Sequence, residues 1–293
     1  MTLGTRRTGR SLVPWLFLFP ALLLFALFKF WPMAEGIQLS LHEVRPFLGD
    51  RWVGLDNYVK VLDDSLFQDA AWHTVILAAG TTLGSMVIGF LLALLLEGHA
   101  RSLWIVRSAV FLPVVAATAV IGEIWRLLYF AAPEGALNSI LSWFGTGPST
   151  FLDSPDTALW SVMAVGIWKG APYDMVLILA GLAGIDRQYY EASNIDGATL
   201  RQRLWYVTLP ALRPVVTILL TLAAIRGLRV FTEVFVLTDG GPAGSTSVWM
   251  TAVYSRGFER NEIGVAAAAS VLLFLVTFAL TVIVRIYRRR KEV

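Results

Sequence analysis

Several ionisable side chains interrupt the long apolar stretches of this sequence. Lys169 and Asp174 lie in one apolar stretch. Arg226, Arg229 and Glu233 lie in another. A charge in the middle of a bilayer costs roughly 2.5–3.5 kcal/mol on insertion scales, so such residues normally face a cavity or an opposite charge. These residues are therefore candidates for a polar route through a membrane, although Arg229 and Glu233, four residues apart, could also neutralise each other on a helix.

Aromatic side chains accompany the charges, because Trp168 and Tyr173 flank Lys169 and Phe231 follows Arg229. An aromatic face beside hydrogen-bonding groups suits a sugar ring, but aromatic residues also pack inside any helical bundle. Glu123 and Arg126 are spaced to pair on one helix face, which favours a structural role for them. We predict a substrate path formed by Lys169, Tyr173, Arg226, Arg229, Phe231 and Glu233.

Signatures of catalysis and metal binding are missing from the sequence. It has no cysteine, which excludes disulfides and thiolate metal sites. The three histidines (His42, His73 and His99) are scattered, and neither H-E-x-x-H nor G-x-S-x-G occurs. The run "LTDGGPAGSTS" lacks the lysine of a phosphate-binding loop. We predict no catalytic residue, no metal ligand and no cofactor in this chain.

The composition is that of a membrane protein. Of the 293 residues 56% are hydrophobic and only 15% are charged, against about 25% charged in soluble domains. The net charge of +3 is small, and nucleic acid is not an expected partner. A membrane-spanning helix needs about 20 mostly apolar residues. The sequence predicts an all-α fold with six such helices, at residues 11–31, 74–96, about 105–130, about 157–179, about 212–237 and 263–284.

The distribution of Lys and Arg predicts the orientation of these helices. Basic residues are concentrated at both ends of the chain and in the loops that follow the second and fourth predicted spans. By contrast, residues 131–157, after the third span, contain no Lys or Arg. Both termini are therefore expected in the cytoplasm, and the first apolar run is too long for a cleaved signal peptide. The predicted division of the chain is a cytoplasmic N-terminus (1–10), a first helix with an outer loop (11–71), a five-helix core (72–284) and a basic tail (285–293).

A polar segment at residues 186–211, which includes "YEASNIDGATLRQRLWYVTLP", lies in the predicted cytoplasmic loop between the fourth and fifth spans. Asp186 is suited to cap a helix start, and Gly197 is suited to end that helix. A second helical piece then leads to Pro210 at the entry of the next span. The segment could be an interfacial helix that merely connects two spans. The arrangement of Glu191, the small residues Ala192 and Ser193, and Gly197 favours a surface that contacts another protein.

This segment resembles the EAA loop of permease subunits of binding-protein-dependent ABC importers. The match consists of Glu191-Ala192-Ser193, a glycine six residues after the glutamate and Leu209-Pro210. "GIWKGAPYDMVLILAGLAGI" and "LRVFTEVFVLTDGGPAGST" are similar to the carbohydrate branch, the maltose-permease-like subunits. Ser193 replaces the second alanine of the motif, and His73 stands where the family often has asparagine.

The resemblance implies a type I ABC importer permease fold and a coupling helix that docks on a separate ATPase. The implied coupling residues are Glu191, Ala192, Ser193, Asp196, Gly197, Leu209 and Pro210. We assign a gating loop on the outer side to Gly240, Gly241 and Pro242, which break the end of the fifth span.

The resemblance also implies the partners of the chain. These are a second homologous permease subunit, two ATPase subunits that bind ATP and Mg, and an extracytoplasmic solute-binding protein or lipoprotein, assembled in a prokaryotic cell membrane. The expected function is import of a sugar or small oligosaccharide. A glycerophosphate-type anion importer and a non-transporting membrane scaffold stay open as alternatives, and the charges in the fourth and fifth spans argue against the scaffold.

Overall fold

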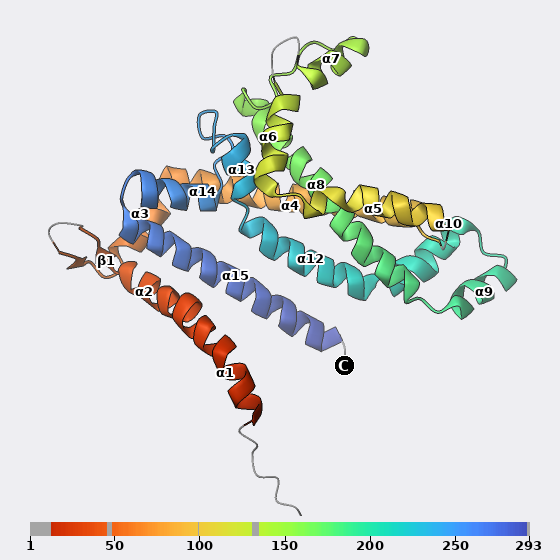
Figure 1. Cartoon of the computed structure of the whole chain (residues 1–293), viewed down its shortest axis with the longest axis horizontal. Helices are drawn as coiled ribbons and strands as arrows, with labels where there is room; N and C mark the ends of the chain where they lie inside the picture. Colours follow the sequence, from red (N-terminus) through yellow and green to blue (C-terminus); the bar gives the residue numbers. More distant parts are fainter. Residues whose placement is uncertain (1–12, 46–48, 99, 131–134, 292–293) are drawn as a thin grey trace, which may run out of the picture. The chain divides into compact units, whose positions relative to one another are not determined.

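The computed structural model describes residues 13–45, 49–98, 100–130 and 135–291. They form two compact units, one of Met1–Val61 with Arg256–Leu272 and one of Leu62–Ser255 with Leu273–Val293 (Figure 1). The predicted N-terminal segment 1–10, His99, and the side chains of 287–293 in the basic tail lie outside the described part of the chain.

The first unit begins with one long helical segment. Helix α1 (Val13–Phe25) continues through the π-helical turn η1 (Ala26–Phe30) into α2 (Trp31–Leu39). Together they provide a candidate membrane span over Pro14–Leu39. The span is longer than predicted at its C-terminal end, because Pro32 falls in the first turn of α2, where a helix tolerates proline.

The segment that follows α2 in the first unit is held by polar contacts at the backbone. Strands β1 (His42–Glu43) and β2 (Arg51–Trp52) pair antiparallel and are followed by α3 (Asp56–Asp63). The buried Asn57 donates hydrogen bonds of 2.9 Å to the carbonyls of Ser40 and His42. A hydrogen bond from Arg45, with the charge of Arg51, lowers the pKa of Glu43. Apart from this two-stranded ladder, the regular structure in the described ranges is helical, as predicted.

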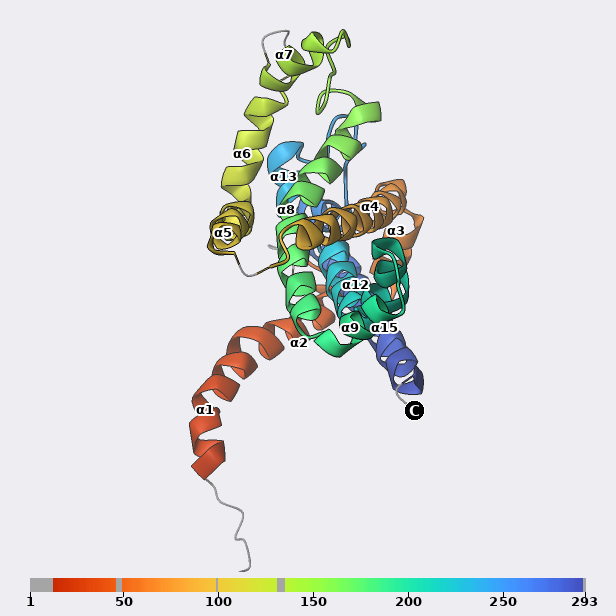
Figure 2. The same ribbon diagram turned by 90° about the vertical axis from the view of Figure 1, so that its right-hand side faces the viewer.

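Two long helices form the centre of the second unit (Figures 1 and 2). Helix α4 (Ser65–Leu95) packs along α8 (Pro155–Ala183). A Cβ on Gly89 of α4 would lie 2.8 Å from the carbonyl oxygen of Ala171 and 2.9 Å from the amide nitrogen of Met175. Glycine at this position therefore lets the two helix backbones approach closely. Helix α4 starts earlier than the predicted span because Asp64 accepts a capping hydrogen bond from the Leu66 amide.

The predicted span over about residues 105–130 is broken into two helices. The segment forms α5 (Arg101–Val115) and α6 (Thr118–Leu128), which are bent by 97° at an extended Ala116–Ala117 linker. Pro113 removes a backbone donor from the last turns of α5, which weakens the helix just before the bend. Helix α7 (Ala136–Trp143) follows in the next loop.

The predicted span over about residues 212–237 is also interrupted. Helix α12 (Arg213–Leu228) ends, and α13 (Thr232–Leu237) begins after a short irregular segment. Upstream, the residues Leu200–Ala211 form α10 (Leu200–Arg203), the π-helical turn η2 (Leu204–Thr208) and α11 (Leu209–Ala211), and they meet α12 at a bend of 62°.

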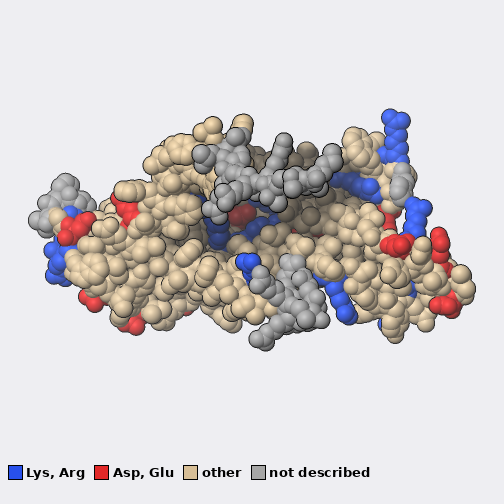
Figure 3. Space-filling model, turned by 90° about the horizontal axis from the view of Figure 1, so that it is seen from below, with Lys and Arg blue, Asp and Glu red and all other residues tan. Residues whose placement is uncertain are grey.

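The remaining helices are α9 (Arg187–Ile195), α14 (Trp249–Tyr254) and α15 (Ile263–Lys291), with the π-helical turn η3 (Ser255–Glu259) before α15. Over the described residues, four helices alone are long and apolar enough to cross a membrane, and there are six candidates if each bent pair is one span. This range includes the predicted six. Most of the face drawn in Figure 3 is uncharged, with Lys, Arg, Asp and Glu gathered in separate patches.

Candidate functional site

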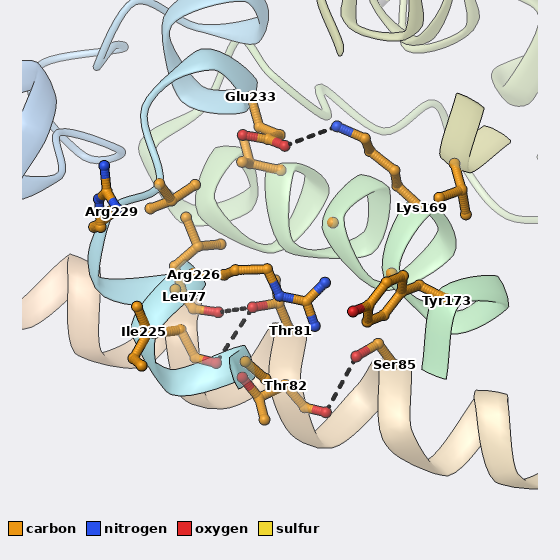
Figure 4. A pocket seen from close by; sticks show the side chains of 18 residues that line it. Leu77, Thr81, Thr82, Ser85, Lys169, Tyr173, Ile225, Arg226, Arg229 and Glu233 are labelled. Carbon is orange, nitrogen blue, oxygen red and sulfur yellow. Dashed lines mark hydrogen bonds and ion pairs between the residues drawn. The ribbon is translucent and has the colours of Figure 1, made fainter. Parts of the chain in front are cut away.

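A cavity of about 470 Å³ lies in the second unit, lined by α4, α8, α12 and the segment that follows α12 (Figure 4). Five of the six predicted path residues line it, namely Lys169, Tyr173, Arg226, Arg229 and Glu233. Phe231 is not among the lining residues. Its ring stacks on Phe235 at 5.1 Å between centroids and contacts Tyr254 at 5.6 Å. The charged residues are thus brought together, whereas Phe231 packs in an aromatic cluster.

An ion pair closes one side of the cavity. The Lys169 ammonium on α8 lies 3.1 Å from a carboxylate oxygen of Glu233 on α13, and it also donates a hydrogen bond to the Thr118 hydroxyl on α6. The two charged side chains are only 20% and 25% exposed, so water screens the pair weakly. The predicted alternative, a pair between Arg229 and Glu233, is wrong because the chain leaves helical geometry between α12 and α13.

A second cation, Arg226, lies beside an aromatic ring of the lining. Its guanidinium lies over the Tyr173 ring at 4.6 Å from the centroid (Figure 4). It also lies 3.7 Å from the Oδ1 of Asp174. Asp174 is buried, and its Oδ2 accepts a 2.7 Å hydrogen bond from the Ser85 hydroxyl of α4. Asp174 therefore ties α4 to α8 and holds the charge that keeps Arg226 beside Tyr173.

The third cation, Arg229, lies at the edge of the lining, on the cap of α12 (Figure 4). Its side chain has no hydrogen-bond or ion-pair partner among the residues that the structure describes. A cation at a helix C-terminus is stabilised by the helix dipole, which favours this position without a neutralising acid.

Hydroxyl groups of α4 form another wall, and they were not among the predicted path residues. Thr81, Thr82 and Ser85 line the cavity. They lie in a stretch without charge, so the search for charged residues passed over them. The spacing of Thr81 and Ser85, four residues apart in the uncharged part of the helix, is the signal that could have identified a polar face. Cations, hydroxyls and an aromatic ring together can bind a polar solute by charge, hydrogen bonds and stacking.

The predicted coupling segment has the expected local structure. The Asp186 side chain accepts a 2.9 Å hydrogen bond from the Gln188 amide at the start of α9, and Gly197 adopts φ +70° just after its end. Glu191 and Asp196 are exposed. Ser193 is buried and donates a 2.8 Å hydrogen bond to the Tyr190 carbonyl, so its hydroxyl is turned toward its own helix. The confirmed helix, glycine turn and second helix present an exposed surface that carries charges of both signs.

The predicted gating loop lines a second cavity of about 810 Å³. Gly240 adopts φ +81°, and the Gly241–Pro242 peptide bond is cis. Glu123 and Arg126 line the same cavity and pair at 3.2 Å, as their spacing predicted. Both of their side chains are more than half exposed. This pair therefore lies outside the cavity of Lys169 and Arg226. No group of three or more metal-ligating residues occurs in the described part of the chain.

Apolar helices around a charged cavity define an integral membrane protein with an internal polar site. The sequence matches the family described as binding-protein-dependent transport system inner membrane component over residues 10–293. The chain therefore belongs to this family of transport permeases.

Three relatives illustrate the similarity. The trehalose/maltose transport system permease protein MalF of Thermococcus litoralis is 31% identical, covering 95% of this chain and 94% of that protein. The sn-glycerol-3-phosphate transport system permease protein UgpA of Agrobacterium fabrum is 32% identical, covering 92% of both. A chain of the bacterial alginate ABC transporter, crystallised with an alginate pentasaccharide-bound periplasmic protein, is 25% identical, with a TM-score of 0.83 and coverage of 96% and 95%.

Proposed function

We propose that this chain is the membrane-spanning permease subunit of an ATP-driven importer, and that it carries a sugar or small oligosaccharide through the cavity lined by Lys169, Tyr173 and Arg226. The observation that carries the proposal is the convergence of charged, hydroxyl and aromatic side chains on one cavity between apolar helices. Hydroxyl-rich solutes need such hydrogen-bonding groups, and an aromatic ring suits a sugar face. The similarity to the trehalose/maltose and alginate systems supports a saccharide as the solute.

The energy for transport enters through the segment 186–211. Glu191 is exposed on α9, and Ile195 and Leu200 are 87% and 77% exposed at the turn between α9 and α10. Large apolar side chains at this level of exposure favour a docking surface for another protein. A separate ATPase subunit docks here, with Ala192, Asp196 and Leu209-Pro210 shaping the contact. The inward orientation of Ser193 argues that this serine affects the helix itself more than the partner.

A permease subunit of an ATP-driven importer works with several partners. A second homologous permease completes the path, two ATPase subunits bind and hydrolyse ATP with Mg, and this chain is not catalytic. An extracytoplasmic binding protein delivers the solute, and the periplasmic protein in the alginate complex supports this arrangement. The loop of Gly240, Gly241 and Pro242 faces the outer side of a prokaryotic cell membrane and takes part in gating. Both termini lie in the cytoplasm.

A glycerophosphate-type anion is the second candidate solute, favoured by the two guanidinium groups of Arg226 and Arg229 in the lining and by the similarity to the glycerol-3-phosphate permease. A scaffold without a solute path would leave these charges without a role.

The test is uptake by the complete transporter reconstituted in lipid vesicles with ATP, using a panel of labelled neutral and acidic saccharides and sn-glycerol 3-phosphate. We expect ATP-dependent uptake of at least one member of the panel. An assembled transporter that hydrolyses ATP and accumulates none of them would contradict the proposal.

A further inference from the structure

The charges around the cavity do not balance. Three cationic residues line it, Lys169, Arg226 and Arg229, whereas Glu233 is the one carboxylate in the lining. Lys169 and Glu233 neutralise each other at 3.1 Å. Asp174 lies behind the lining and offsets part of the charge of Arg226 at 3.7 Å. One positive charge therefore remains without a counter-charge among the residues that the structure describes.

The hydrogen-bonding capacity of the two arginines is also unused within the described residues. Each guanidinium carries five N–H donors in a planar fork. Arg226 lies 3.7 Å from Asp174, which is beyond hydrogen-bond length, and its guanidinium carbon lies 4.6 Å from the centroid of the Tyr173 ring. Neither Arg226 nor Arg229 donates a side-chain hydrogen bond within the described ranges. The Arg226 side chain is 50% exposed, so its donors are available to a solute.

Two contacts orient Arg226 before any solute binds. Ser85 donates to one oxygen of the buried Asp174, and the other oxygen faces Arg226. The Tyr173 ring lies beside the guanidinium on another side, 4.6 Å from its carbon. A cation held in place loses little conformational freedom on binding, and a planar guanidinium matches carboxylate and phosphate groups with two parallel hydrogen bonds.

We propose that the cavity prefers solutes that carry an anionic group, a carboxylate or a phosphate, and that Arg226 binds this group while Arg229 adds attraction at the edge. The proposal rests on the proposed transport function and names the class of its solute. Acidic oligosaccharides and polyol phosphates share the required chemistry. A neutral sugar would leave the remaining positive charge in the cavity uncompensated.

The experiment uses two matched pairs of labelled probes on the purified complete transporter without nucleotide. Digalacturonate is compared with the neutral disaccharide galactobiose, and sn-glycerol 3-phosphate is compared with glycerol, by equilibrium dialysis at low and high salt. We expect at least one anion to bind about tenfold or more tightly than its neutral partner, with a smaller ratio at high salt. The pair that shows the larger ratio identifies the source of the anionic group.

Three variants test the assignment. Arg226→Gln should reduce the preference to below about threefold, and Arg226→Lys should retain part of it, because Lys keeps the charge but not the fork. Arg229→Gln removes a side chain without a protein partner in the described part, so it should assemble normally and still weaken the preference. Arg101→Gln, an exposed arginine at the start of α5 outside both cavities, is the matched control and should change nothing.

Equal binding within both pairs, or a preference unchanged in both Arg226→Gln and Arg229→Gln, would overturn the inference. Equal binding within both pairs is also the expected result if an acidic residue of the partner permease neutralises the cavity, and the inference fails in that case too. ATP-driven uptake of a neutral saccharide without anion preference would leave the transport function intact and remove only this inference. Absence of any ATP-driven uptake would remove the transport function itself.

Discussion

The coupling segment 186–211 and the charged cavity are held together in opposite ways. In the segment, partners are close in sequence: Thr199 caps α10 by accepting from the Gln202 amide, and Arg203 donates to Asn194 nine residues away at 2.7 Å. In the cavity, partners are distant. Lys169 and Glu233 are 64 residues apart, and Ser85 and Asp174 are 89 apart.

This difference implies different roles for the two regions: the segment contributes an exposed surface, and the cavity contributes partly buried charges. The segment is exposed, so its side chains contribute little to the stability of the chain, and its value lies in the surface that it presents. The cavity depends on charges that several helices bring together, and removing one charge leaves its partner partly buried without compensation. Substitutions in the segment should therefore affect transport alone, whereas substitutions in the cavity should affect transport and packing together.

The largest effect is expected from Glu191→Lys in the segment. Reversing an exposed charge on the docking surface should reduce uptake by about 100-fold or more, while assembly in the membrane and thermal stability stay unchanged. Uptake and thermal unfolding of the reconstituted transporter measure the two properties. Glu97→Lys is the matched control, because it makes the same charge change in an exposed residue just after α4 and should retain uptake. Normal uptake in Glu191→Lys would remove the coupling role.

The next effect concerns the ion pair of the cavity. Lys169→Glu and Glu233→Lys each place like charges together at about 20% exposure, and each should reduce uptake about tenfold or more and lower the unfolding temperature. The double exchange Lys169→Glu/Glu233→Lys should restore much of both, as measured by a double-mutant cycle.

The same double-mutant cycle on Glu123 and Arg126 provides a comparison with the Lys169–Glu233 pair. It is exposed and its residues are three apart on one helix, so its coupling energy should be about 0.3–0.5 kcal/mol. A cycle in which the exposed pair couples as strongly as the cavity pair would contradict the distinction between the two.

A third expectation concerns the packing that supports the cavity. Gly89→Ala would place a Cβ within 3 Å of the backbone of α8, and we expect a loss of about 1–3 kcal/mol in the free energy of unfolding. Gly36→Ala is the matched helical control, since nothing lies within 4 Å of its added Cβ. Denaturant unfolding in detergent measures both variants. Equal stability of the two would show that close contact between α4 and α8 is not required.

The smallest effect should come from the glycine turn of the segment. Gly197 adopts φ +70° with open space around it, so Gly197→Ala should cost about 1–2 kcal/mol in the local turn and reduce uptake by a few-fold. Gly197→Asn tolerates this backbone conformation and should retain more uptake. Hydrogen exchange of the α9 amides reports the local change. An Asn variant as impaired as the Ala variant would argue against backbone conformation as the cause.

The sequence was sufficient where the physical cause is local. The cap at Asp186, the turn at Gly197 and the pair of Glu123 and Arg126 were all predicted from spacing. The bend between α5 and α6 was missed because a hydropathy window detects apolar length and not direction. The choice of Lys169 as the partner of Glu233 was missed because it depends on how α8 and α13 pack, which no spacing rule contains.

The most direct test of the account is the accessibility of the cavity in two states of the complete transporter. The chain has no cysteine, so Thr81→Cys in the cavity lining provides a single label site in this subunit. A membrane-impermeant maleimide is applied from either side, without nucleotide and after trapping with ADP and vanadate. We expect labelling from the inner side without nucleotide and from the outer side in the trapped state. Labelling from the same side in both states would contradict a cavity that alternates between the two sides of the membrane.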